Sequence, residues 1–174
     1  AEDWVSDQLT EKNMEPYKGP SNIELEQKGV LAIFLGYYFP WDPEISLKVA
    51  SAHGFQSRLE GSKTGYYNYA DIDDDFISIH HYLKWYKFGM TRLFDNLSLE
   101  IRNGRKSREE AIQIVKERGD DIPHNDIAKF CQFINISNNE FFSVIEPFRN
   151  LEIWKKSSGT WQIENFIIND WNWK

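Results

Sequence analysis

Residues 73–89 read DDDFISIHHYLKWYKFG, and this stretch decides the fold. Three aspartates, Asp73 to Asp75, open it, a mostly aromatic and aliphatic run follows, and Gly89 closes it. Acidic side chains suit the positive N-terminal end of a helix, and glycine readily takes the left-handed conformation that ends one. The pattern therefore predicts a helix that runs from the acidic residues to Phe88.

The cation-capable side chains of this helix share one sector. With about 100° per residue and Phe76 set at zero, they fall between roughly 20° and 140°. They are His80, His81, Lys84 and Lys87. Because the remaining arc is apolar, we expect a mostly buried helix whose cationic wall could face an anion such as pyrophosphate or a sugar diphosphate. The alternative is a solvent-exposed face whose lysine stems cover apolar surface.

Helix signals continue on both sides of this stretch. Predicted helices begin at Asp42 with Pro43, at Thr91, at Ser107 with Glu110, at Pro123 and at Ser137 with Glu140, and they end at Gly54, Gly104, Gly119, about Asn135 and before Pro147. Residues 31–39 are predicted to form a buried strand or extended segment, and residues 160–174 could add a strand. The sequence predicts a single, mainly α domain: a polar lead-in segment at residues 1–29, then a helical C-terminal domain at residues 30–174 with one or two short strands.

Composition narrows the class of function. Among 174 residues there are seven Trp, eight Tyr and twelve Phe, more than a core alone suggests, so we expect an additional docking surface that could support a homo-oligomer. The formal net charge of −7 argues against nucleic-acid binding. The single cysteine, Cys131, lies among apolar residues and is predicted to pack in the core, which fits a reducing, cytoplasmic setting. No apolar stretch is long enough for a membrane span.

The helix that follows Gly89 carries a second set of polar candidates. Arg92, Asp95, Asn96 and Arg102 lie off its apolar stripe. They could form a polar network that faces a substrate, or simple surface pairs three and four residues apart.

Two further groups have both a functional and a structural interpretation. Asp73 and Asp74, with the neighbouring Asp71 and Asp75, could hold a magnesium ion, or they could only start the helix. Tyr67, in the long segment between residues 54 and 70, could stack with its neighbouring tyrosines on a sugar ring, or pack on the core.

Several long strings resemble a known family. They are EKNMEPY (11–17), FLGYYFPWDP (34–43), TGYYN (64–68), DIDDD (71–75), HHYLKWYKFG (80–89) and DNLSLEIRNGR (95–105). Together they resemble the C-terminal portion of the N-acetyl sugar amidotransferases, the WbpG and PseA type enzymes of bacterial lipopolysaccharide and flagellin-sugar biosynthesis. The resemblance covers essentially the whole chain.

The resemblance implies an ATP-dependent amidotransferase that converts an N-acetamido group of a sugar or sugar nucleotide to an acetamidino group. It also implies a glutaminase subunit that supplies ammonia, and an ATP-pyrophosphatase half with a Ser-Gly-Gly-x-Asp-Ser loop. This sequence contains no such loop and no other glycine-rich phosphate motif. We therefore expect ATP and Mg²⁺ to serve the full-length enzyme, to bind this chain alone only weakly, and the chain alone to be inactive.

Within this interpretation the candidate residues receive roles. Lys84 and Arg92 are predicted to be catalytic, His80, His81, Lys87, Tyr67, Asp95, Asn96 and Arg102 to bind substrate, and Asp73 and Asp74 to bind metal. The rival hypothesis is a non-catalytic interaction module that docks a glutaminase or forms an oligomer. A third, a tRNA-modifying ATP-pyrophosphatase, is disfavoured by the acidic charge balance.

Overall fold

The structure, a computed structural model, describes residues 4–6 and 8–173. The chain forms two compact units, residues 1–41 and residues 42–174. The helices described in the first unit are α1 (Glu11–Met14), η2 (Glu15–Tyr17), α2 (Asn22–Gln27) and α3 (Leu35–Tyr38). Helix α2 begins with a capping box, in which the Ser21 hydroxyl accepts from the Glu24 N–H and the Glu24 carboxylate accepts from the Ser21 N–H.

The predicted buried strand at residues 31–39 is wrong. The segment contains the short helix α3 instead, and its large apolar side chains are exposed, with 89% of Phe34 and 85% of Tyr37 accessible. A buried strand needs a neighbour to bond its backbone N–H and C=O groups. The described residues of the first unit include no strand that could pair with it. An apolar, aromatic composition is shared by strands and by exposed docking segments, so composition did not separate them.

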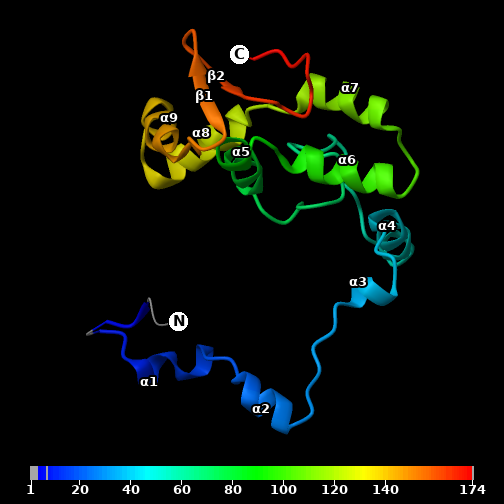
Figure 1. Ribbon diagram of the computed structural model, residues 1–174, viewed down its shortest axis with the longest axis vertical. Helices are drawn as coiled ribbons and strands as arrows, with labels where there is room; N and C mark the ends of the chain where they lie inside the picture. Colours follow the sequence, from blue (N-terminus) through cyan, green and yellow to red (C-terminus); the bar gives the residue numbers. More distant parts are fainter. Residues whose placement is uncertain (1–3, 7, 174) are drawn as a thin grey trace. The chain divides into compact units, whose positions relative to one another are not determined.

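The second unit contains all six helices predicted there (Figure 1). They are α4 (Pro43–Ala52), α5 (Ile77–Phe88), α6 (Arg92–Arg102), α7 (Arg108–Arg118), α8 (His124–Ile134) and α9 (Asn138–Ile145), followed by η3 (Glu146–Phe148). The predicted boundaries hold because the capping chemistry forms. The Asp42 carboxylate accepts from the Glu44 N–H at 2.9 Å, and Gly89 ends α5 with φ 65°. At Ser137 the structure shows one half of the predicted capping box, a 3.1 Å bond from the Glu140 N–H.

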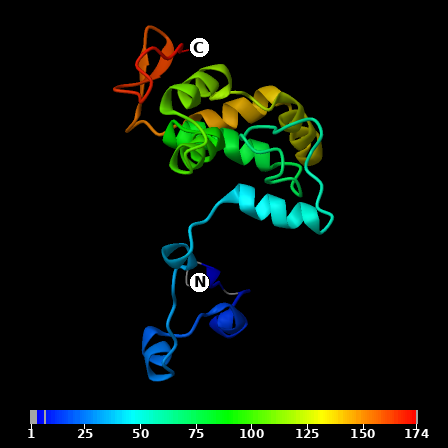
Figure 2. The ribbon, with the colours of Figure 1, turned by 90° about the vertical axis from the view of Figure 1, so that its right-hand side faces the viewer.

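A two-stranded antiparallel hairpin follows the helices. Strand β1 (Trp154–Ser157) pairs with β2 (Thr160–Ile163), and Ser158 and Gly159 form its turn with φ 50° and 88°. The strand predicted beyond residue 160 is thus confirmed, whereas β1 was not anticipated. In both views the C-terminal segment (red) lies beside this hairpin (Figure 1, Figure 2). The mainly α fold with short strands is confirmed.

Two apolar clusters form the core, and α5 contributes to both. The first holds Trp85, Leu93, Phe94, Leu97, Ala111, Val115, Trp154, Ile168 and Trp171. The second holds Ile79, Tyr82, Tyr86, Ile127, Cys131, Phe141 and Ile145, so Cys131 packs in the core as predicted. Helix α5 therefore lies between the hairpin side and the α8–α9 side of the unit, and its residues organise the fold.

Arg105 joins the start of this unit to the end of α6. Its guanidinium donates to both oxygens of Glu100 at 2.7 and 2.8 Å and to Asp42 at 2.8 Å. The Tyr67 hydroxyl donates to the same Glu100 carboxylate at 2.6 Å. The hydrogen bonds from Arg105 hold the pKa of Glu100 below its usual value, so this buried carboxylate is ionised.

We predict that Arg105→Gln lowers the free energy of unfolding by roughly 2 kcal/mol, because Glu100, only 4% exposed, loses its cation. Chemical denaturation measures the change. Arg108→Gln, which removes an exposed arginine at the start of α7, is the matched control. Equal stabilities of the two variants would contradict this role of Arg105.

Candidate functional site

The segment between α4 and α5 is fastened to α5 and α6 by polar contacts. The Thr64 hydroxyl lies 3.0 Å from His81 Nδ1, and Asn96 Oδ1 accepts from the Tyr66 N–H at 3.0 Å. A Cβ atom on Gly65 would lie 2.8 Å from Asn96 Oδ1, so glycine allows this close approach. These bonds bring Tyr67, His81 and Asn96, three of the predicted substrate-binding residues, around one small hollow of about 20 Å³.

Four predicted site residues, together with Asp71, meet at the edge of this segment. We call this group the loop cluster; it consists of Asp71, His81, Lys84, Arg92 and Asp95. Lys84 forms an ion pair with Asp95, and Arg92 lies 3.7 Å from Asp71 and 3.9 Å from Asp95. His81 Nε2 lies 3.8 Å from the Asp71 carboxylate. Two members of the cationic wall predicted for α5, His81 and Lys84, thus have carboxylate partners within the chain. The adjoining hollow holds no more than a water.

Arg92 nonetheless keeps one unusual atom. Its Nε is buried and makes no hydrogen bond within the described part of the chain. Buried donors are almost always paired, so an unpaired one asks for an explanation, such as an acceptor that arrives with a ligand.

Other predicted residues lie apart from this cluster. His80, Lys87 and Arg102 are exposed, and Lys87 Nζ lies 5.3 Å from the centre of the Phe88 ring. Tyr67 stacks on Tyr69 with ring centres 4.9 Å apart and is buried, as the core-packing interpretation expects. Their roles as substrate-binding residues stay predictions.

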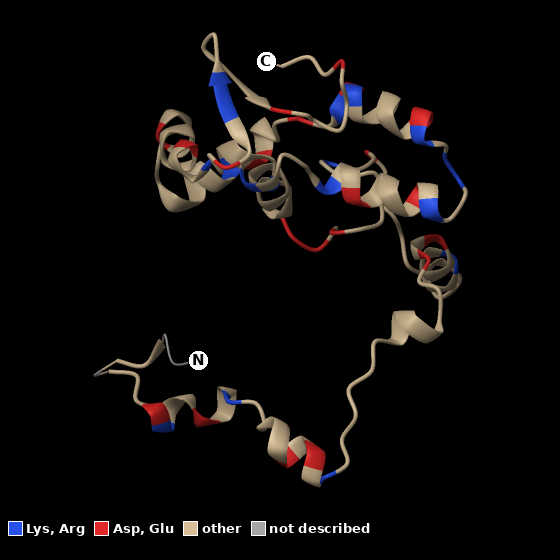
Figure 3. Ribbon diagram, in the orientation of Figure 1, with Lys and Arg blue, Asp and Glu red and all other residues tan. Residues whose placement is uncertain are grey.

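The aspartates lie just before α5, whose N-cap residue is Phe76 and has no side-chain cap. The Asp74 carboxylate accepts from the Phe76 N–H at 2.7 Å, and both Asp73 and Asp74 are exposed in the acidic segment that leads into α5 (red in Figure 3). Across residues 4–6 and 8–173, no group of three His, Cys, Asp or Glu side chains is placed to hold a metal ion. Metal binding at Asp73 and Asp74 therefore stays a prediction.

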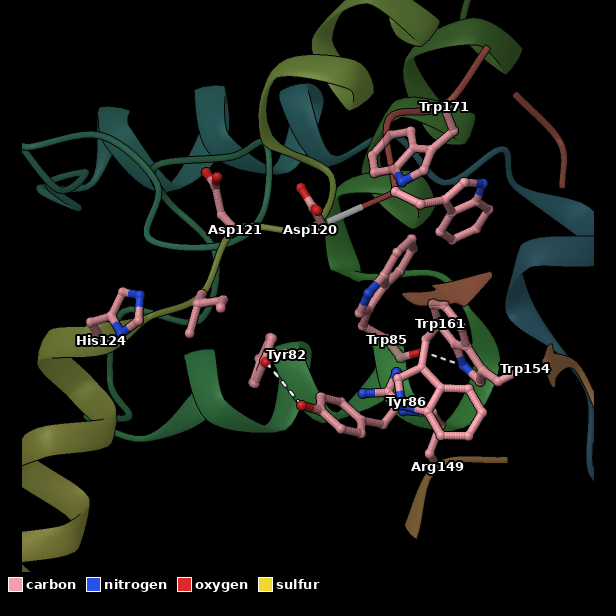
Figure 4. Close-up of a pocket in the computed structure, with 12 residues that line it drawn as sticks. Tyr82, Trp85, Tyr86, Asp120, Asp121, His124, Arg149, Trp154, Trp161 and Trp171 are labelled. Carbon is pink, nitrogen blue, oxygen red and sulfur yellow. Dashed lines mark hydrogen bonds between the residues drawn. The ribbon is translucent and has the colours of Figure 1, made fainter. Parts of the chain in front are cut away.

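One hollow of the second unit is lined by none of the predicted residues. This cavity, which we call the tryptophan cavity, has a volume of about 480 Å³ (Figure 4). It is lined by Tyr82, Trp85, Tyr86, Asp120, Asp121, Ile122, His124, Arg149, Trp154, Trp161, Trp171 and Trp173. Most rings come from α5, the hairpin and the C-terminal segment, while the carboxylates come from the connection between α7 and α8 (Figure 4).

One cation lines the tryptophan cavity in a fixed position. The Arg149 guanidinium carbon lies 4.0 Å from the ring centre of Tyr86, 5.0 Å from that of Trp154 and 5.1 Å from that of Trp161. Its Nε and Nη2 donate to the two oxygens of Glu146 at 3.1 and 2.9 Å. Glu146 also accepts from Trp161 Nε1 at 2.6 Å, so the cage that surrounds Arg149 is itself hydrogen-bonded.

The tryptophan cavity has the size and lining of a small-molecule site. Such sites have volumes of about 300–1,000 Å³ and aromatic walls with a few polar groups. Sequence reasoning missed it because its walls come from three separated parts of the chain, near residues 82–86, 120–124 and 149–173. The available signal was the run of four tryptophans after residue 150, Trp154, Trp161, Trp171 and Trp173, which no helix or strand period explains.

His81 gives the loop cluster a pH-dependent stability. Burial lowers the pKa of His81 to about 4, and the nearby Asp71 only partly opposes this. An unfolded histidine titrates near 6.5, so between these values the unfolded state binds the extra proton and stability falls as the pH falls.

We predict that the wild-type chain loses roughly 2–3 kcal/mol more stability than His81→Gln between pH 7 and pH 4.5. Denaturant unfolding at both pH values gives this difference. His53→Gln, which removes an exposed histidine, is the control. The same pH dependence in wild type and His81→Gln would show that His81 does not stay neutral in the folded state.

Comparison with known proteins identifies the family of the chain. No curated protein matches it significantly. The profile of a family described as "LPS biosynthesis protein WbpG-like, C-terminal domain" matches residues 60–167, which include the loop cluster and most of the tryptophan cavity. No helix in residues 4–6 and 8–173 is long and apolar enough to cross a membrane. The match covers more than half of the chain, and the chain therefore belongs to the family of WbpG-like C-terminal domains of lipopolysaccharide biosynthesis proteins.

Proposed function

We propose that this chain is the sugar-holding C-terminal part of an ATP-dependent amidotransferase in surface-polysaccharide biosynthesis. Membership of the WbpG-like family supports a role in the biosynthesis of lipopolysaccharide sugars. The single observation that carries the proposal beyond the family is the tryptophan cavity, because its lining has the chemistry that a sugar requires.

A pyranose ring presents C–H groups on its faces and hydroxyl groups around its edge. The Trp and Tyr rings of the cavity offer flat apolar surfaces against which such faces can pack. Carboxylates only accept hydrogen bonds and a guanidinium only donates them, so Asp120, Asp121 and Arg149 can serve opposite ends of a polyol. The cavity volume of about 480 Å³ is in the usual range for such a ligand.

The proposed reaction replaces the oxygen of an N-acetamido group by nitrogen. The amide oxygen attacks the α-phosphorus of ATP and pyrophosphate leaves, then ammonia adds to the activated carbon and AMP departs with the former amide oxygen. In this proposal ATP and Mg²⁺ belong to an ATP-binding half, and a glutaminase subunit releases the ammonia. The described residues of this chain do not fit a metal site, so we assign them no step through magnesium.

The loop cluster is our candidate for the charged leaving groups. Lys84 and Arg92 are held by Asp95 and Asp71, and the Nε atom of Arg92 has no hydrogen-bond partner in the described residues. An incoming pyrophosphate could replace these carboxylates as the partner of both cations, which are the groups that bind phosphoryl oxygens well.

A second candidate function is an interaction module that docks the glutaminase or a second copy of the chain. The exposed aromatic and aliphatic side chains of residues 30–41 favour it, because monomeric proteins rarely leave so many large apolar groups together in solvent. Sugar binding separates the two functions, since a docking module has no need of a sugar site.

We predict that the 174-residue chain binds the methyl glycoside of N-acetylglucosamine and that Trp161→Ala weakens this binding about tenfold. Isothermal titration calorimetry or ligand-observed NMR measures the affinity. Trp41→Ala removes an exposed tryptophan outside the cavity and should leave the affinity unchanged. If the wild-type chain binds no N-acetylated hexoside, the cavity is not the sugar site.

A further prediction concerns the full-length enzyme. Lys84→Met should lower turnover by roughly 10²–10³ while the melting temperature changes little, because Lys84 is half-buried and would act on developing negative charge. Lys155→Met, an exposed lysine on β1, is the matched control. Turnover of Lys84→Met equal to that of the control would assign the loop cluster a structural role alone.

A further inference from the structure

The Arg149 side chain is held by aromatic rings as well as by its ion pair with Glu146. Its side chain is 8% exposed, three aromatic rings surround it, and Glu146 accepts two of its hydrogen bonds. The pKa of Glu146 is lowered chiefly by this hydrogen bonding, so the pair carries balanced charge. These contacts fix the orientation of the guanidinium, so its free N–H groups point in a constant direction.

One end of that guanidinium is left for a ligand. Nε and Nη2 bind Glu146, whereas Nη1 makes no hydrogen bond within residues 4–6 and 8–173. Nη1 also remains accessible. In the described residues, the buried side-chain polar atoms that lack a hydrogen-bond partner are the Tyr69 hydroxyl and Arg92 Nε, and Arg149 Nη1 is not one of them. Since Arg149 lines the tryptophan cavity, its free N–H groups are available to a molecule that enters it (Figure 4).

The polar groups of the cavity are segregated. In Figure 4 Asp120 and Asp121 lie on one side and Arg149 on the other, among the rings of Tyr86 and Trp161. A carboxylate offers only acceptors, so it can bind the hydroxyl groups of a sugar but not an amide oxygen. The amide oxygen of an N-acetyl sugar fits the Arg149 end, where a fixed donor stands and the rings also offer an apolar surface for the acetyl methyl group.

We infer that Arg149 determines which form of the sugar the tryptophan cavity retains: it donates to the carbonyl oxygen of an N-acetamido group and repels an acetamidino group. The inference rests on the proposed function for the two forms of the sugar. It does not require that the reaction take place within the cavity.

The chemistry of the exchange explains the discrimination. An amide oxygen is an acceptor, and it is replaced in the reaction by a nitrogen that is protonated at neutral pH. The resulting amidinium has N–H donors only, so it offers no acceptor to the free N–H groups of Arg149. The substrate is held and the product is released by the same side chain.

The carboxylates and the aromatic faces of the cavity act in the opposite direction, because both attract cations. An amidinium that binds at the Asp120 and Asp121 end would be held more tightly than the acetamido sugar. The two placements therefore predict opposite results. Binding at the Arg149 end favours the acetamido sugar, whereas binding at the carboxylate end favours the acetamidino sugar.

The first experiment uses the unmodified chain. The dissociation constants of methyl 2-acetamido-2-deoxyglucoside and its 2-acetamidino analogue are compared at pH 7 by ligand-observed NMR. We expect the acetamidino compound to bind at least tenfold more weakly. Equal or tighter binding of that compound overturns the role of Arg149 and leaves sugar binding intact, whereas failure of both compounds to bind overturns this inference together with the cavity as the sugar site.

The second experiment changes the side chain. Arg149→Gln keeps a donor and adds an acceptor, so the ratio of the two affinities should fall to within about twofold, while Arg108→Gln on α7 should keep the wild-type ratio. Circular dichroism establishes that the variant is folded. A folded Arg149→Gln with the wild-type ratio overturns the inference, and if the variant does not fold, the ratio measured on the unmodified chain still decides it.

Discussion

The burial of the Trp154 indole against α5 is the contact on which the rest of the second unit depends. The ring is 2% exposed, its centre lies 5.2 Å from that of Trp85, and its Nε1 donates to the Trp85 carbonyl at 3.2 Å. An indole buried in this way contributes a large apolar area and satisfies its one donor. The contact fixes the hairpin to α5, and with it Trp161 and one side of the cage around Arg149. The contact between Trp154 and Trp85 therefore belongs both to the apolar core and to the wall of the tryptophan cavity.

Helix α5 connects the two candidate sites without merging them. On one side Trp85 and Tyr86 line the tryptophan cavity, and on another His81 and Lys84 belong to the loop cluster. The first is an open aromatic hollow with one fixed cation, whereas the second is a set of charges that already neutralise each other. A neutral, ring-shaped ligand suits the first, and only a ligand with strong negative charge could compete for the cations of the second.

Sequence reasoning succeeded where the signal is local. The caps at Asp42 and Ser107 and the stop at Gly89 depend on side chains within a few residues, so they fixed the helices of the second unit. It failed where partners are distant. The apolar residues 31–39 read as a strand because burial was assumed, and the cavity was missed because Arg149 meets Tyr86 only after the chain has folded. Helical spacing placed Lys84 in one sector of α5, but it could not show that Asp95 lies opposite it.

The location of the cavity also bears on how the larger enzyme would divide its work. Every residue that lines it lies in the unit formed by residues 42–174, and the sequence carries no glycine-rich loop for ATP. Under the proposed function, the sugar is therefore recognised within this unit, apart from the site that binds ATP. Under the proposed function, a site that held the product as tightly as the substrate would slow product release, so an affinity that changes with the reacting group favours turnover. Under our inference Arg149 provides such a change, because conversion of the amide to an amidinium replaces a hydrogen-bond acceptor by N–H donors.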